Sequence, residues 1–207
     1  MHYCTITAAA LAAAGLAFSG AASAQTATSS TTTDSSRMPY QSGFWGHAGV
    51  SAGRGELDAS CVGAGLACDK KDNAFRAYVG GRFNNAIGLE VGALNIGDYS
   101  RGGGKTDGWG MDVALIAGVP IGANSSIFGK LGTAYTRTDV TGSPAGIAAG
   151  LRTGEESGWG PRWGVGAQVG LTPQWAVRLD WDRFQVQLPA GDEDLDALML
   201  GVQYTFR

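Results

Sequence analysis

Residues 200–206 alternate apolar side chains with small or polar ones. One face carries Leu200, Val202, Tyr204 and Phe206, and the other carries Gly201, Gln203 and Thr205. In water, a strand with so apolar a face would be prone to aggregation. A closed barrel surrounded by lipid requires such a face on its outside. The segment therefore predicts a membrane-spanning strand.

The same alternation recurs upstream. The segments are residues 44–53, 74–83, 86–96, 109–119, 125–136, 159–171, 175–184 and, last, 195–206. The connections after the second, fourth and sixth segments are short, and the others are long. Short periplasmic turns and longer external loops are typical of outer-membrane barrels. We predict an all-β fold over residues 43–207: an eight-stranded antiparallel up-and-down transmembrane β-barrel with long external loops, short periplasmic turns and both termini in the periplasm.

Charged side chains fall on the face opposite the apolar one. They are Arg76, Arg82, Glu90, Asp112, Lys130, Arg162, Arg178 and Asp180. A soluble barrel would turn its apolar face inward, whereas an apolar outer face lets these charges share one interior. Buried charges must pair, so we expect Glu90, Asp112, Lys130 and Arg178 to lie in one network. Two roles stay open: a structural salt-bridge plug, or a gate whose pairs re-form to let small ions pass.

Aromatic residues gather near the ends of the segments. They are Trp45, Trp109, Trp159, Trp163, Trp175, Trp181 and Phe206. Such positions predict aromatic girdles at the membrane interfaces, and ordinary aromatic packing is the alternative.

Residues 1–24 are typical of a secretory signal peptide. An apolar stretch from Ile6 to Phe18 precedes Ala22-Ser23-Ala24, which fits the small-x-small cleavage rule. A short core helix is the alternative. Residues 25–42 are rich in Ser and Thr and predict a disordered leader. No later stretch has ~18 consecutive apolar residues, so an integral membrane protein must be a barrel. We therefore expect the cell outer membrane of a Gram-negative-type cell.

The overall composition fits this interpretation. Glycine accounts for 34 of 207 residues, about twice the usual share. Only 16% of residues are charged and the net charge is -3, so the chain carries no sign of nucleic-acid binding.

The mature chain offers few groups for chemistry. Cys61 and Cys68 lie in the first long loop, and secretion into an oxidising compartment predicts a disulfide between them. Their spacing does not fit zinc. His47 and Ser51 fall on the inner face, but a hydrolase or acyltransferase also needs a placed acid and an oxyanion site. Residues 102–106 lack the full spacing and the helix of a phosphate loop, and predict a flexible external hairpin loop. We predict no catalytic residues, cofactor or metal.

Three motifs together resemble a known family. They are Gly88-Leu89-Glu90-Val91-Gly92 with Asn95-Ile96-Gly97, the stretch from Val177 to Phe184, and Asp194-Leu195-Asp196 leading to Leu200–Phe206. Over roughly residues 44–207 the chain is similar to the OmpA-like transmembrane barrel family. The resemblance implies an eight-stranded barrel in the outer membrane. Many members add a C-terminal peptidoglycan-binding domain, which we do not expect after this last strand.

The resemblance does not fix the activity, because members are described as narrow pores, adhesins or structural proteins. We expect a structural or surface-interaction role, with recognition at external loops such as 137–158 and 192–194. The alternatives are a narrow pore gated by lumen salt bridges and, last, a lipid-modifying enzyme. The expected partners are outer-membrane lipid and lipopolysaccharide, the barrel-assembly machinery through the C-terminal strand, and a surface ligand at the loops.

Overall fold

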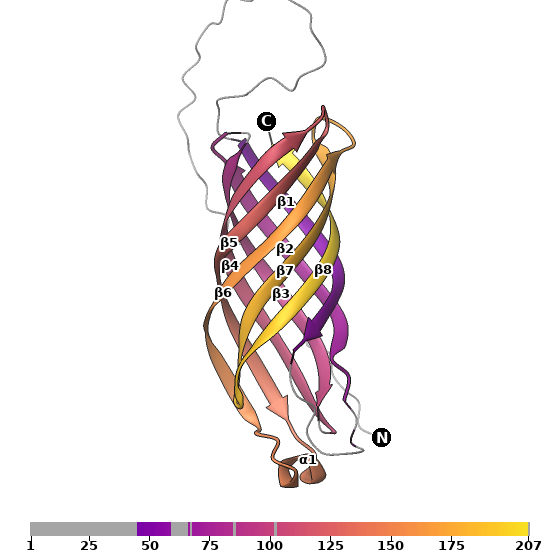
Figure 1. The fold of residues 1–207 in the computed structure, drawn as a ribbon, viewed down its shortest axis with the longest axis vertical. Coiled ribbons are helices and arrows are strands. Elements are labelled where there is room, and N and C mark those ends of the chain that lie inside the picture. The colour runs from indigo at the N-terminus through magenta and orange to yellow at the C-terminus, as the bar shows by residue number, and fades with distance from the viewer. Residues whose placement is uncertain (1–44, 59–65, 67, 85, 102, 207) are drawn as a thin grey trace, which may run out of the picture. The chain divides into compact units, whose positions relative to one another are not determined.

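The chain forms a closed antiparallel barrel in a computed structural model, which describes residues 45–58, 66, 68–84, 86–101 and 103–206. The strands are β1 (Trp45–Leu57), β2 (Lys71–Arg82), β3 (Ile87–Arg101), β4 (Gly104–Ile121), β5 (Ser125–Thr141), β6 (Gly154–Gly170), β7 (Trp175–Leu188) and β8 (Gly191–Phe206), with one short helix, α1 (Pro144–Ala148), between β5 and β6. Each strand pairs with its sequence neighbours, and β1 closes on β8 through Gly46 opposite Phe206 (Figure 1). The predicted eight-stranded barrel is confirmed. The predicted signal peptide and leader lie outside the described residues.

The two ends of the barrel differ in their connections. Short turns join β2 to β3, β4 to β5 and β6 to β7 at the end where β1 starts and β8 finishes. We call this the turn end and the opposite one the hairpin end. Within the described residues, no helix is long and apolar enough to cross a membrane.

Three predicted loops at the hairpin end contain strand instead. β3 and β4 pair as far as Arg101 opposite Gly104, and β7 and β8 pair as far as Leu188 opposite Gly191. Of the loop predicted over residues 137–158, residues 137–141 belong to β5 and residues 154–158 to β6. Residues 104–106, predicted as part of a loop, therefore lie in β4. Gly103 and Gly191 have φ of 71° and 130°, a backbone region that glycine adopts without strain. The sequence signal was lost here because both faces of a strand beyond the lipid can be polar.

The outer face is apolar, as the alternation predicts. Large hydrophobic side chains there are about half exposed or more, such as Leu131 at 68% and Leu200 at 59%. Such exposure suits lipid and not water.

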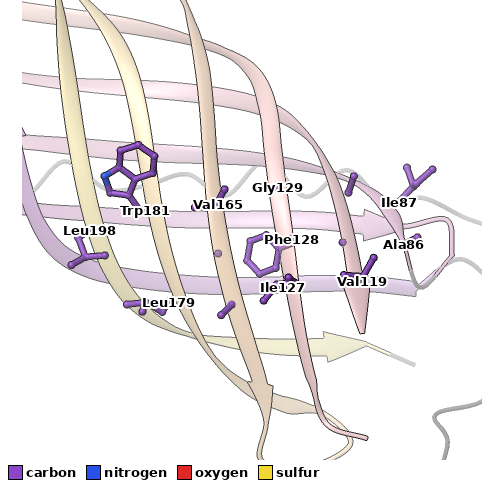
Figure 2. Close-up of a pocket in the computed structure, with 14 residues that line it drawn as sticks. Ala86, Ile87, Val119, Ile127, Phe128, Gly129, Val165, Leu179, Trp181 and Leu198 are labelled. Carbon is purple, nitrogen blue, oxygen red and sulfur yellow. The ribbon is translucent and has the colours of Figure 1, made fainter. Parts of the chain in front are cut away.

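The outer face also has a shallow groove that runs across the strands from β3 to β8. An apolar groove of about 700 Å³ lies where Ala117, Gly129 and Ala167 leave the strands thinly covered, between Ile87 at one end and Trp181 and Leu198 at the other (Figure 2). Binding sites use a few placed polar groups to orient a ligand. This lining is apolar, so the groove is lipid-facing surface and not a centre of chemistry.

The lumen is filled in two layers. Polar and charged side chains occupy its middle. An apolar cluster fills the part of the lumen nearer the hairpin end. Its members are Leu57, Ala74, Leu94, Ile96, Tyr99, Ala134, Val140, Leu151, Phe184, Val186, Leu188, Leu195, Ala197 and Met199. Eight-stranded barrels are just wide enough for side chains to fill, and the apolar cluster completes that filling here.

Candidate functional site

The candidate site is the charged layer of the lumen. Glu90 on β3 accepts hydrogen bonds from Arg76 on β2 and from Arg178 on β7, with nitrogen–oxygen distances of 2.7 Å in both cases. Arg76 also binds Asp112 on β4 through two nitrogens, at 3.0 and 2.9 Å. Alternating strand positions aim all four side chains into the barrel.

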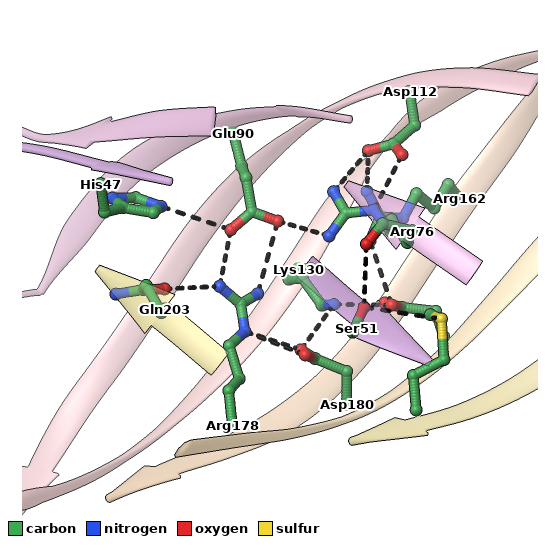
Figure 3. Close-up of polar contacts among 12 residues, drawn as sticks. His47, Ser51, Arg76, Glu90, Asp112, Lys130, Arg162, Arg178, Asp180 and Gln203 are labelled. Atoms are coloured by element: carbon green, nitrogen blue, oxygen red, sulfur yellow. Dashed lines mark hydrogen bonds and ion pairs between the residues drawn. The ribbon is translucent and has the colours of Figure 1, made fainter. Parts of the chain in front are cut away.

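The contacts continue until they close on themselves. Asp112 also pairs with Arg162 on β6. Arg162 reaches Asp182 on β7 at 3.1 Å, and Lys130 on β5 bridges Asp182 at 2.7 Å and Asp180 at 2.8 Å. Arg178 then binds Asp180 at 2.9 Å. We call this set the charge ring: Glu90, Arg76, Asp112, Arg162, Asp182, Lys130, Asp180 and Arg178 (Figure 3).

The charge ring alternates in sign around its whole circuit. Every carboxylate contacts two cations and every cation contacts two carboxylates, so the ring is neutral. Its side chains are at most 1% exposed. Buried ions are costly unless they are paired and hydrogen-bonded. The doubled pairing balances every charge of the ring, while Arg162 Nε and Nη2, Asp180 Oδ2 and Asp182 Oδ1 lack an aligned hydrogen bond among the described residues.

The two strands that contribute no ring member also reach the ring. His47 on β1 lies 3.4 Å from Glu90, between Nε2 and Oε2, and Gln203 on β8 accepts a hydrogen bond from Arg178 at 3.1 Å. All eight strands are thereby linked across the lumen (Figure 3).

Aromatic rings pack against the guanidinium groups. The Arg178 guanidinium carbon lies 4.7 Å from the centre of the Tyr78 ring and 4.4 Å from that of Phe128. Arg162 stands 4.9 Å from Phe184 of the apolar cluster. Such contacts add cation–π attraction, and the last one joins the two layers of the lumen.

The sequence-predicted lumen charges all lie inside the barrel and are buried. All of them except Arg82 are members of the charge ring; Arg82 is the last residue of β2, at the turn end. Asp182 was missed as a candidate. The same alternation that places Arg178 and Asp180 inside places Asp182 inside too, so its signal was present in the sequence.

His47 and Ser51 do not form a nucleophile and base pair. The Ser51 hydroxyl contacts the Arg76 carbonyl oxygen at 3.5 Å and the Met199 sulfur at 3.8 Å. His47 faces Glu90, which is already shared between two arginines. Both residues are buried, at 2% and 6% exposure. The arrangement lacks the hydroxyl–imidazole contact that an activated serine needs.

The predicted girdle residues occupy the outer surface in two groups. Trp175 packs against Tyr204, and Tyr204 against Phe206, near the turn end. Closer to the hairpin end, Trp163 packs against Trp181 with ring centres 5.0 Å apart. Trp109 and Trp159 also face outward, and Trp45 begins β1 half-buried. Their role as interfacial girdles stays a prediction.

The predicted disulfide also stays a prediction, because Cys61 lies outside the described residues. We expect a thiol-reactive reagent to label denatured protein that comprises residues 25–207, and so lacks Cys4, at two sites after reduction and at none before it. A Cys61→Ser variant should leave Cys68 open to the reagent without reduction. Equal labelling of the unreduced and reduced wild-type protein would refute the bond.

Each of the four strand pairs that meet at the hairpin end bears an ion pair on its outer face, exposed in three cases and half-buried in the fourth, that of Arg183 and Asp196. Lys71 bonds Glu56 at 3.2 Å, Lys105 bonds Asp98 at 3.1 Å, Arg137 bonds Glu155 at 2.7 Å, and Arg183 bonds Asp196 at 2.6 Å. Ion pairs in water are weak, but they mark the level at which the outer surface stops being apolar.

Comparisons with known proteins agree with this geometry. Residues 9–206 match the family described as outer membrane protein beta-barrel domain. The chain is 27% identical over 176 residues to outer membrane protein A of Serratia marcescens, a match that covers 81% of this chain and 46% of that protein. The chain thus spans about half the length of this relative.

Solved structures share the fold. Neisserial surface protein A is 13% identical with a TM-score of 0.56, covering 79% of this chain and 97% of that one. Outer membrane protein OprG of Pseudomonas aeruginosa is 16% identical with a TM-score of 0.55, covering 81% and 98%. The family match, the OmpA relative and the closed lipid-facing barrel converge: the chain belongs to the OmpA-like outer-membrane β-barrel proteins and is an integral protein of the outer membrane.

Proposed function

We propose that this protein is a sealed barrel with a structural and surface-interaction role, in which the lumen holds the barrel shut and the hairpin end carries recognition. One observation supports the sealed state above others: the charge ring and the apolar cluster follow one another along the lumen. An ion would have to break buried pairs and then pass an apolar constriction, which excludes ions by dewetting. Short turns face the periplasm in this class of barrel, so the hairpin end faces outward.

A narrow pore is the second candidate. Each ring member has two partners, so pairs can be exchanged without leaving a charge alone, as a gate would require. The apolar cluster argues against it, because re-pairing the ring leaves that cluster in place. An enzymatic role has the least support, since His47 and Ser51 bind other groups. Contacts with lipopolysaccharide and with the barrel-assembly machinery through β8 are further proposals.

Ion conductance in a planar lipid bilayer tests the sealed state. We expect the refolded mature protein to insert without discrete conductance steps, because both layers block the lumen. Insertion is checked independently by the heat-dependent shift in electrophoretic mobility, and bilayers treated with detergent alone serve as the control. Discrete steps that change when Lys130 or Glu90 is neutralised would replace the sealed barrel with a gated pore.

A further inference from the structure

The barrel wall has a free strand edge at the hairpin end. The pairing of β6 with β7 stops at Arg162 opposite Phe184, although β6 continues back to Gly154 and β7 on to Leu188. On its other side, β6 stays paired with β5 as far as Gly154 opposite Val140. Among the residues that the structure describes, residues 154–161 of β6 therefore have a neighbouring strand on one side only.

Pro161 explains where the pairing stops. The Gly160 carbonyl accepts a hydrogen bond from the Thr133 hydroxyl of β5 at 2.8 Å, so it points towards β5. Backbone groups of successive residues point to opposite sides of a strand. The Pro161 nitrogen therefore points towards β7, where a donor is needed and proline has none.

Beyond this point β7 lies against the inner face of β6 and not beside its edge. The Thr138 hydroxyl of β5 donates a hydrogen bond to the Gln187 carbonyl of β7. A Cβ atom at Gly158 would stand 2.2 Å from the Gln187 side chain, and one at Gly160 would stand 2.5 Å from the Gln185 carbonyl. Glycine at these two inward positions lets β7 pass behind β6, which leaves the edge of β6 open.

The same alternation identifies the groups at the free edge. The N–H and C=O groups of Glu155, Ser157 and Trp159 point away from β5, and all three residues are exposed, with Trp159 at 65%. An exposed row of such groups is a template for pairing with another strand. Proline and charge are the usual protections of an edge. Pro161 lies at the inner limit of this edge, and the charge of Glu155 is engaged by Arg137.

The charges beside the edge select the strand that fits it. Asp107 on β4 stands directly opposite Asp139 on β5, and Asp139 directly opposite Glu155 on β6. Like charges directly opposite one another are destabilising. Arg137 is the one cation that pairs with this row among the described residues, through Glu155. A further strand that places Lys or Arg opposite Glu155 would add a second cation beside these three carboxylates, and a β-branched residue opposite Trp159 would pack on its ring.

We propose that residues 155–159 of β6 bind an extended basic segment of a partner protein by antiparallel strand addition. Main-chain hydrogen bonds to the edge supply affinity, and the residues opposite Trp159 and Glu155 supply selectivity. The proposal refines the surface role proposed above and rests on it only for placing recognition at the hairpin end. A conducting barrel would overturn the sealed state and leave peptide binding at the edge unaffected.

The test uses a fluorescent peptide, Thr-Val-Thr-Thr-Thr-Lys-Thr, and the mature protein refolded in lipid vesicles. In antiparallel register its Val lies opposite Trp159 and its Lys opposite Glu155. We expect fluorescence anisotropy to show binding that weakens at least tenfold when the Lys is replaced by Glu, or when the peptide amides facing β6 are methylated. Equal binding of all three peptides would overturn the proposal.

Two variants at one position separate edge pairing from general adhesion. Ser157→Pro removes an N–H at the free edge while keeping the β5 pairing, and we expect at least a tenfold loss of peptide affinity. Ser157→Ala keeps the N–H and should bind as the wild type does. Hydrogen exchange of the wild-type protein supplies a measurement that does not depend on folding of a variant. The amides of Ser157 and Trp159 should exchange at least tenfold more slowly with peptide bound, and unchanged exchange would overturn the proposal.

Discussion

Replacing Lys130 with Met should lower the free energy of unfolding by about 3–5 kcal/mol, the cost of removing one partner from a buried ion pair. Lys130 bridges Asp180 and Asp182 at 2.8 and 2.7 Å, and its side chain is 0% exposed. Without it the charge ring opens into a linear chain whose two ends are carboxylates. The buried set then has a net charge of minus one. Denaturant unfolding in lipid vesicles measures the loss.

A second substitution distinguishes broken pairing from lost packing. In Lys130→Met with Asp182→Asn, the remaining buried charges are balanced again, and Arg162 keeps Asp112 as a partner. We expect the double variant to recover part of the stability lost in the single one. Lys105→Met is the matched control, because Lys105 is 56% exposed and pairs with Asp98 at the surface, so its effect should be much smaller. A Lys130→Met protein as stable as the wild type would mean that the ring does not stabilise the barrel.

The alternation of apolar and polar residues predicts the strands because the membrane constrains both faces of each strand, the outer and the inner. Lipid demands apolar side chains outside and tolerates charge only inside, so positions such as Arg178 and Leu179 could be assigned to a face from sequence alone. Beyond the lipid this constraint ends. The extensions of β3 to β8 at the hairpin end carry polar residues on their outer faces, so the sequence pattern there predicts loops where the structure has strands.

The pairing within the lumen was less accessible to prediction. Alternation shows that Glu90, Asp112, Lys130 and Arg178 face inward, but the choice of partners depends on strand register and on the shear of the closed barrel. Glu90 and Arg178 are 88 positions apart in the chain and meet only across the lumen. The apolar cluster was missed for a related reason. Leu195 and Met199 are apolar residues at inward positions, and a pattern that assigns apolar residues to lipid has no place for them.

Replacing Phe184 with Ala should cost about 3–5 kcal/mol of unfolding free energy through the cavity that it leaves in the apolar cluster. Phe184 is 0% exposed, and its ring lies 4.9 Å from the Arg162 guanidinium. The substitution therefore removes both core packing and the contact that joins the two layers of the lumen. Denaturant unfolding in vesicles again gives the loss.

Phe75 supplies the matched control, since it is a phenylalanine on the outer face with 55% exposure. When Phe75 becomes Ala, lipid chains can refill the space, so only the transfer of the ring is lost and no lasting cavity remains. We therefore expect Phe184→Ala to be clearly the more destabilising of the two. If both variants lost the same stability, the packing of the apolar cluster would not stabilise the barrel.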